Sequence, residues 1–280
     1  MWLAAAIVLL AALADAPSGA AALLAEADRH FSRRGQDARG ARCHPEPIDA
    51  ALDSYRAALA SDPALVPARV GILRSLFFRA GYCGEGGEAQ KRRFEQAKRL
   101  AEDSEKWIEG HVGAKLRRGR VEPFRPVPGA AALFFWCGVS WGQWSLDHKL
   151  AAAWQGAARR VRDLGELALA LDPEYEQGSP HLLLGRLHTE SPKIPLVTGF
   201  VSRRQGFEHL RRAHAIAPAN SVARFFLADA MLRHEPSSRT RALRLLRECA
   251  AADPRPDYLV EDRHYAEKAR ERLRALGEAP

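Results

Sequence analysis

The sequence contains few β-branched residues, and no stretch alternates apolar and polar side chains as a half-buried strand would. Valine, isoleucine and threonine are sparse, whereas alanine and leucine dominate. These unbranched side chains lose little rotamer freedom in a helix. We therefore expect an all-α chain without sheet. Its 280 residues are enough for one large or two small domains.

The usual catalytic and nucleic-acid-binding motifs are also missing. The sequence has no H-E-x-x-H, no G-x-S-x-G, no phosphate-binding loop and no dinucleotide fingerprint. The formal net charge is +8, but the arginines are spread among acidic residues and form no block with interleaved aromatics. We therefore expect that the protein is not an enzyme and has no catalytic residue. We also expect no metal, no cofactor and no nucleic-acid partner. We interpret the basic charge as a solvated surface. Binding of an anionic ligand or partner is the alternative interpretation.

Residues 1–16, MWLAAAIVLLAALADA, are apolar apart from one aspartate and end in small residues that fit a signal-peptidase site at 14–16 or 12–14. The apolar core of about 13 residues is short for a membrane span. No Lys or Arg precedes it, and a buried N-terminal helix is the alternative. No cysteine follows it, so no lipobox is visible. We predict a signal peptide and a periplasmic protein that is soluble or peripherally associated with the envelope.

The four cysteines contain no C-x-x-C pair, which argues against zinc or thioredoxin-like chemistry. Cys43 and Cys83 both lie in glycine-rich loop sequence, and export would permit a disulfide between them. Cys137 and Cys249 fall on apolar helical faces, where we expect small buried side chains.

A spacing of small residue, larger residue, alanine and proline recurs along the chain. The first three positions share one helical face, a small residue at a crossing lets two helices approach, and proline ends the helix. The four copies are Ala51, Tyr55, Ala58 and Pro63; Val161, Gly165, Ala168 and Pro173; Gly206, Leu210, Ala213 and Pro218; and Ala242, Leu246, Cys249 and Pro254.

This spacing predicts an irregular tetratricopeptide-like α-α superhelix of antiparallel helix pairs. We divide it into an N-terminal helical-repeat half, 20–112, and a C-terminal half, 130–280. A proline- and glycine-rich loop, 113–129, joins them. The second half contains an aromatic-rich central helix and ends in an amphipathic capping helix over 260–276.

The central segment AALFFWCGVSWGQWSL, which begins at residue 131, concentrates the aromatic content of the chain. It is either a core helix that joins the two halves, or a wall of a cavity for an apolar or amphipathic ligand. Trp154 extends the same surface if the neighbouring helices pack antiparallel. The aromatic candidates within the segment are Phe134, Phe135, Trp136, Trp141 and Trp144.

The third repeat places about a dozen extra residues, rich in proline and basic side chains, between its two helices. This insertion either carries function or only packs. His181 and His188 lie seven apart on one helical face, where packing is the favoured role. The ligand- or partner-binding candidates from this region are His181, Arg186, Lys193 and Arg203.

Residues 130–232 carry a resemblance to a known family. They include WCGVSWGQW, a helix ending in LALDPEY, and the run from GSPHLLLGRLHTESPKIPLVTGF to FFLADAML. This segment resembles the T component of tripartite ATP-independent periplasmic (TRAP) transporters. The resemblance implies an exported helical-repeat protein that associates with a periplasmic solute-binding protein and forms a homo-oligomer. It also implies a channel or groove for hydrophobic small molecules, and it supplies no catalytic residues. Members often carry a lipobox, which is not visible here.

Two non-enzymatic hypotheses follow. The first is an accessory protein of a TRAP-type uptake system that binds a receptor and an apolar or amphipathic ligand. The second is a generic tetratricopeptide scaffold in the cell envelope that grips a partner. The scaffold predicts that the aromatic segment is wholly buried and that no cavity lies beside it.

Overall fold

The computed structural model describes residues 19–279, and this part of the chain is all-α, as predicted, with no β-strand. The predicted signal peptide, 1–16, lies outside the described residues. None of the described helices is long and apolar enough to cross a membrane. The helices are α2 (Gly19–Ser32), α3 (Pro45–Ser61), α4 (Val66–Tyr82), α5 (Gly87–Val112), α6 (Ala130–Asp147), α7 (Lys149–Trp154), α8 (Ala157–Leu171), α9 (Tyr175–Glu190), α10 (Arg203–Ile216), α11 (Ser221–His234), α12 (Arg239–Ala251) and α13 (Leu259–Ala275).

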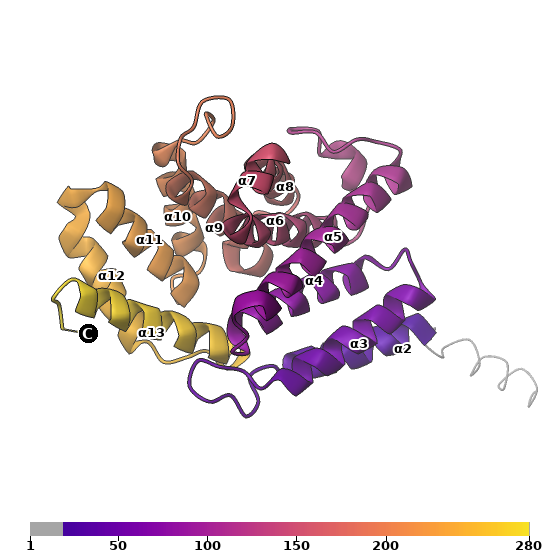
Figure 1. The fold of residues 1–280 in the computed structure, drawn as a ribbon, viewed down its shortest axis with the longest axis horizontal. Coiled ribbons are helices and arrows are strands. Elements are labelled where there is room, and N and C mark those ends of the chain that lie inside the picture. The colour runs from indigo at the N-terminus through magenta and orange to yellow at the C-terminus, as the bar shows by residue number, and fades with distance from the viewer. Residues whose placement is uncertain (1–18, 280) are drawn as a thin grey trace, which may run out of the picture.

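Consecutive helices pack against each other along the whole chain, apart from the short α7, which lies beside α6 and α8. This order is that of a helical-repeat superhelix. The array also curves back on itself, because α13 contacts α4 and the yellow C-terminal helix reaches the indigo and purple N-terminal ones (Figure 1). We call this contact between the two ends the ring closure.

The prolines of the repeat lie just beyond the helices that they were expected to end. α3 ends at Ser61, α8 at Leu171 and α10 at Ile216, each two residues before a proline. α12 ends at Ala251, shortly before the fourth. Since proline has no N–H donor and clashes with the preceding turn, these positions set the helix lengths.

Glycines mark close helix crossings. An added Cβ would lie 2.9 Å from Leu184 at Gly165, 2.7 Å from Leu210 at Gly185 and 2.7 Å from Thr189 at Gly206. These contacts join α8 to α9 and α9 to α10. No larger side chain fits without moving a helix.

Buried side chains form two clusters. The first spans α2 to α8 and also includes Leu187 from α9 and the fully buried Val260 from α13. The second is made by α10 to α13. The loop 113–129 contains a short 3-10 turn, Glu122–Phe124, and Phe124 is buried edge-to-face against Phe134 at 5.2 Å between ring centroids. This loop therefore packs within the first cluster.

A disulfide lies beside the ring closure. Cys43 precedes α3 and Cys83 follows α4, and the structure joins them with 4.5 Å between their Cα atoms. The Cys43 amide donates to the Tyr82 carbonyl at 2.9 Å. The Tyr82 ring in turn contacts His264 of α13 at 5.1 Å between centroids. The other two cysteines, Cys137 and Cys249, are buried free thiols.

Candidate functional site

A large cavity of about 1210 Å³ lies inside the curve of the superhelix. Its walls come from α2, α4, α6, α8, α9, α11 and α13, and its most exposed lining residues, on the loop 191–202 and α7, mark its opening. Both halves of the chain therefore contribute, and the ring closure forms one side. The aromatic side chains of the wall are Phe31, Phe77, Phe78, Tyr82, Phe135, Trp136, Trp154, Tyr258 and Tyr265.

Helix α6 divides its aromatic residues between two faces. Phe135 and Trp136 line the cavity, together with Val139 one turn further along. Phe134, Trp141 and Trp144 are buried and do not line it. Because a helix advances 3.6 residues per turn, positions 135, 136 and 139 share a face that positions 134, 141 and 144 do not. The segment is thus partly core and partly cavity wall.

The core face of α6 is tied to α5 by polar bonds. The Trp141 indole donates to Glu105 at 2.8 Å, and the Trp144 indole donates to Glu95. The Lys98 ammonium lies 4.7 Å from the centre of the Trp141 ring. Burial raises the pKa of Glu105, although the neighbouring Arg160 and the Trp141 indole oppose the rise. These bonds satisfy the indole N–H groups and fix which way α6 faces.

On the cavity face the polar atoms of the aromatic residues hydrogen-bond to one another. The Trp136 indole donates to the Tyr175 hydroxyl at 3.0 Å. Phe77 of α4 contacts Trp136 with 5.6 Å between centroids, and Phe135 contacts Tyr175 at 5.5 Å. Burial raises the pKa of Tyr175, so its phenol stays protonated at neutral pH. The wall therefore presents mainly apolar ring surface to the cavity.

The beginning of α9 is strained at the cavity wall. Glu176 (φ 45°), Gln177 (φ 63°) and Gly178 (φ 78°) are all left-handed, so the regular helix begins after them. Glycine adopts this conformation freely, but Glu and Gln each do so at a cost of about 1–3 kcal/mol. Tyr258 donates to Glu176 at 3.1 Å, and Arg74 lies 3.7 Å from the same carboxylate. Contacts from both ends of the chain thus hold this turn.

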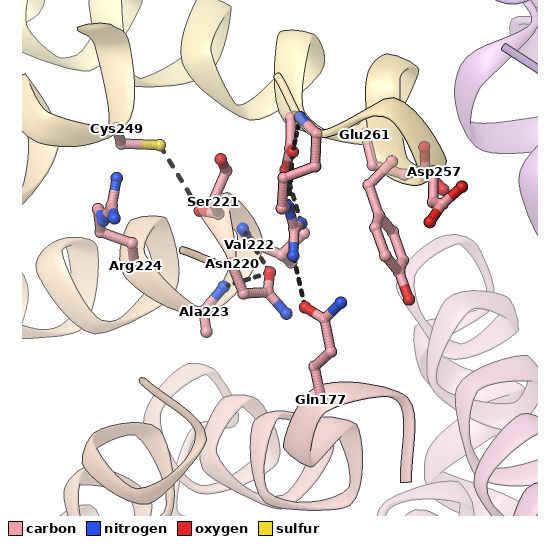
Figure 2. A network of polar contacts seen from close by, with 12 residues as sticks. Gln177, Asn220, Ser221, Val222, Ala223, Arg224, Cys249, Asp257 and Glu261 are labelled. Carbon is pink, nitrogen blue, oxygen red and sulfur yellow. Dashed lines mark hydrogen bonds and ion pairs between the residues drawn. The ribbon is translucent and has the colours of Figure 1, made fainter. Parts of the chain in front are cut away.

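Gln177, at the start of α9 (Figure 2), accepts a hydrogen bond from the guanidinium of Arg255, which precedes α13. Arg255 also forms a two-pronged bond with the buried Asp262, at 2.8 Å on each prong. Next to it, the Asn220 side chain accepts from the amides of Val222 and Ala223 and caps α11. Arg255 and Asn220 both line the cavity, so this network closes one end of it with polar groups.

Two polar atoms at this end have no hydrogen-bond partner within residues 19–279. They are Nε of Arg74 and Oε2 of Glu261, and both residues line the cavity. The other Glu261 oxygen pairs with Arg34 at 3.2 Å. Burial raises the pKa of Glu261, and Arg34 opposes the rise. The two atoms are themselves buried, but Arg74 and Glu261 both line the cavity and add charged groups to its polar end.

The remaining candidates from the sequence lie in different places. Trp154 is at the opening of the cavity, and Arg186 lines its wall, pairs with Glu190 at 3.2 Å and lies 3.9 Å over the Phe226 ring. Arg203 does not line it: its guanidinium donates to the carbonyls of His188, at 2.9 Å, and Thr189, which lie in the last turn of α9. Lys193 is exposed on the loop 191–202.

His181 belongs to a histidine cluster between α9 and α10, away from the cavity wall. Its Nδ1 lies 2.9 Å from Nδ1 of His209, and the His209 ring stacks on His188 at 6.4 Å between centroids. Burial, and secondarily His209, lowers the pKa of His181 and of His188 to about 4. The cluster is therefore neutral at neutral pH. No group of His, Cys, Asp and Glu in the described residues is arranged to hold a metal ion.

The N-terminal wall of the cavity was not predicted from the sequence. Phe77 and Phe78 are adjacent in SLFFRAGY on α4, so they cannot both face the same neighbouring helix. That adjacency is the signal that would have indicated a second contact surface. Nothing in the sequence indicated Arg74 or Glu261.

No protein-family model matches the chain, and no curated protein matches it in sequence. The class is therefore defined by the fold and the cavity alone: an all-α helical-repeat protein whose superhelix encloses an aromatic-lined cavity with a polar end.

Proposed function

We propose that this chain is a non-enzymatic, periplasmic binding protein that holds an apolar or amphipathic ligand in its central cavity. The observation that carries the proposal is the cavity itself, about 1210 Å³ with an aromatic wall and a polar end. Small-molecule sites are commonly clefts of about 300–1,000 Å³ with mostly apolar walls and a few placed polar groups. The apolar part of the ligand lies against Phe77, Phe135 and Trp136, and its polar group lies near Arg74 and Glu261.

We further propose that it serves as an accessory protein of a TRAP-type solute uptake system, as a homo-oligomer that binds a periplasmic solute-binding receptor. This proposal is supported by the position of residues 130–232, the segment that resembles the T component. Phe135 and Trp136 of that segment line the cavity, and its long insertion, residues 191–202, lies at the opening. The generic scaffold is the less favoured reading, because it predicts no cavity beside the aromatic segment.

Filling the cavity is expected to abolish ligand binding. Gly142 lines the cavity, and a Cβ there would meet only one Val161 methyl at 3.9 Å, so Gly142→Trp places an indole in open space. The affinity for anilinonaphthalene sulfonate, an amphipathic anionic probe, should fall about tenfold or more in fluorescence titrations. Native mass spectrometry with lipid extraction should show a bound small molecule in the wild type and none in the variant.

The matched control is Gly110→Trp on α5, where no atom lies within 4 Å of the added Cβ and the residue is exposed. It adds the same side chain to a helix outside the cavity, so probe affinity should equal that of the wild type. Unchanged affinity in Gly142→Trp would contradict the cavity as the binding site.

The transport role has its own test. Affinity purification of the tagged protein from a periplasmic extract should recover a solute-binding protein, identified by mass spectrometry. The same extract passed over the Gly142→Trp variant distinguishes receptor binding from ligand binding, since the receptor contact does not need the cavity to be open. Recovery of only chaperones or unrelated enzymes would count against a TRAP-type role and leave the ligand proposal standing.

A further inference from the structure

The opening of the cavity is surrounded by large apolar side chains that face solvent. Leu150 is 86%, Trp154 94% and Leu196 90% exposed, and Leu146 and Ile194 are also exposed. We call these five residues the apolar rim. Isolated exposed apolar side chains are ordinary, but a group of five around one opening marks an interaction surface.

Local structure holds the rim residues outward. Leu150 and Trp154 lie four apart on α7, so they share one face, while Ala152 on the opposite side is buried. Leu196 has a left-handed backbone (φ 67°), which is costly for a branched side chain. A guanidinium N–H of Arg159 donates to the Leu196 carbonyl, so α8 and the loop 191–202 support each other at the rim. Figure 1 shows both α7 and this loop toward the upper edge of the molecule.

The two segments that carry the rim residues are mostly positive. The segments 146–160 and 191–200 contain the cationic residues Lys149, Arg159, Arg160 and Lys193 and one acidic residue, Asp147. Of the four, Arg160 is paired with Glu105 at 3.3 Å. Exposed aliphatic and indole side chains flanked by Lys and Arg are the composition of surfaces that lie in the head-group region of an anionic membrane.

We propose that the apolar rim docks on an anionic lipid surface, with Leu150, Trp154 and Leu196 entering the head-group region and Lys149 and Lys193 contacting lipid phosphates. In an isologous contact between two copies, the cationic residues of one rim would face those of the other and repel them. An anionic lipid surface supplies the opposite charge. Four of the five rim residues also line the cavity, so docking places its opening against the lipid. In this position a ligand exchanges between the cavity and the membrane. Only this ligand exchange rests on the proposed function.

Vesicle cosedimentation of the full chain tests the docking. The protein should bind vesicles of phosphatidylcholine with added phosphatidylglycerol, bind phosphatidylcholine alone more weakly, and lose affinity as NaCl is raised. A triple variant, Leu150→Ser, Trp154→Ser and Leu196→Ser, should bind about tenfold more weakly or worse. Lys149→Glu with Lys193→Glu should weaken binding only to the anionic vesicles. All chains carry the same apolar N-terminus, so the comparison isolates the rim.

The matched control for charge is Arg241→Glu with Arg274→Glu. These exposed residues lie on α12 and α13, outside the rim, and change the net charge by the same amount. Binding by this control should equal that of the wild type. An equal loss in both charge variants would mean non-specific attraction and would overturn the proposal.

Trp154 also reports its own position. Lipids brominated on their acyl chains should quench the fluorescence of bound protein, and Trp154→Phe should remove that part of the quenching while keeping vesicle affinity. Equal quenching in Trp154→Phe would overturn docking through the rim.

A triple variant that changes from oligomer to monomer in sedimentation equilibrium, with no change in vesicle binding, would assign the rim to a second copy instead. Gly142→Trp should still bind vesicles, which separates failure of docking from failure of ligand binding.

Discussion

Replacing Cys43 and Cys83 by alanine is expected to lower the free energy of unfolding by about 4 kcal/mol. The two residues are 40 apart in sequence, and a covalent link across a loop of that length removes much of the conformational entropy of the unfolded chain. For a chain of this size each kcal/mol corresponds to a melting temperature shift of roughly 2–4 °C. The loss should therefore be plain in thermal or urea unfolding followed by circular dichroism.

The position of the disulfide adds a second effect. Tyr82 precedes Cys83 and contacts His264 of α13 across the ring closure, so loosening the end of α4 also weakens the contact between the two ends. A reductant serves as the control: it should lower the unfolding midpoint of the wild type to that of the double variant, and leave the variant unchanged. If the reductant does not change the unfolding midpoint of the wild type, that result would contradict the structural role of the disulfide.

Substituting Gly71 by alanine should have the next largest effect, a loss of about 3 kcal/mol in the free energy of unfolding. A Cβ at Gly71 of α4 would lie 2.4 Å from the ring of Tyr55 in α3. Tyr55 is fully buried, and its hydroxyl donates to Asp28 of α2, so the ring cannot move without breaking that bond. Relief therefore requires α3 and α4 to separate.

Gly81 on the same helix provides the matched control. An added Cβ there has nothing within 4 Å, so Gly81→Ala should leave stability unchanged or raise it by up to about 1 kcal/mol, as expected for alanine over glycine in a helix. The two variants thus make the same chemical change with opposite expected signs. Equal unfolding midpoints would mean that α3 and α4 do not approach as closely as the structure places them.

The helices were predictable because their signals are local. The prolines beyond α3, α8 and α10 and the small residues Gly165 and Gly206 fix where helices stop and where they cross. These features depend on periodicity and backbone sterics within a few residues. The all-α architecture follows from them.

The cavity was harder to predict because it depends on contacts between distant segments. Arg34 reaches Glu261, and Arg74 reaches Glu176, across separations that no periodicity encodes. The left-handed turn at Glu176 and Gln177 also runs against local preference, and tertiary contacts hold it. Sequence alone therefore located the aromatic segment, but it could not say which of its rings face an internal space.

The ring closure changes how such an array should come apart. In an open solenoid the terminal repeats have one neighbour each, so they fray first and unfolding proceeds inward. Here Val260 of α13 is buried in the cluster formed mainly by α2 to α8, and Arg263 donates to the Gly40 carbonyl. Both ends of the described array, α2 to α13, are therefore held by the closure. The molecule should accordingly lose its structure in a single cooperative step, and a break at the closure should release both ends together.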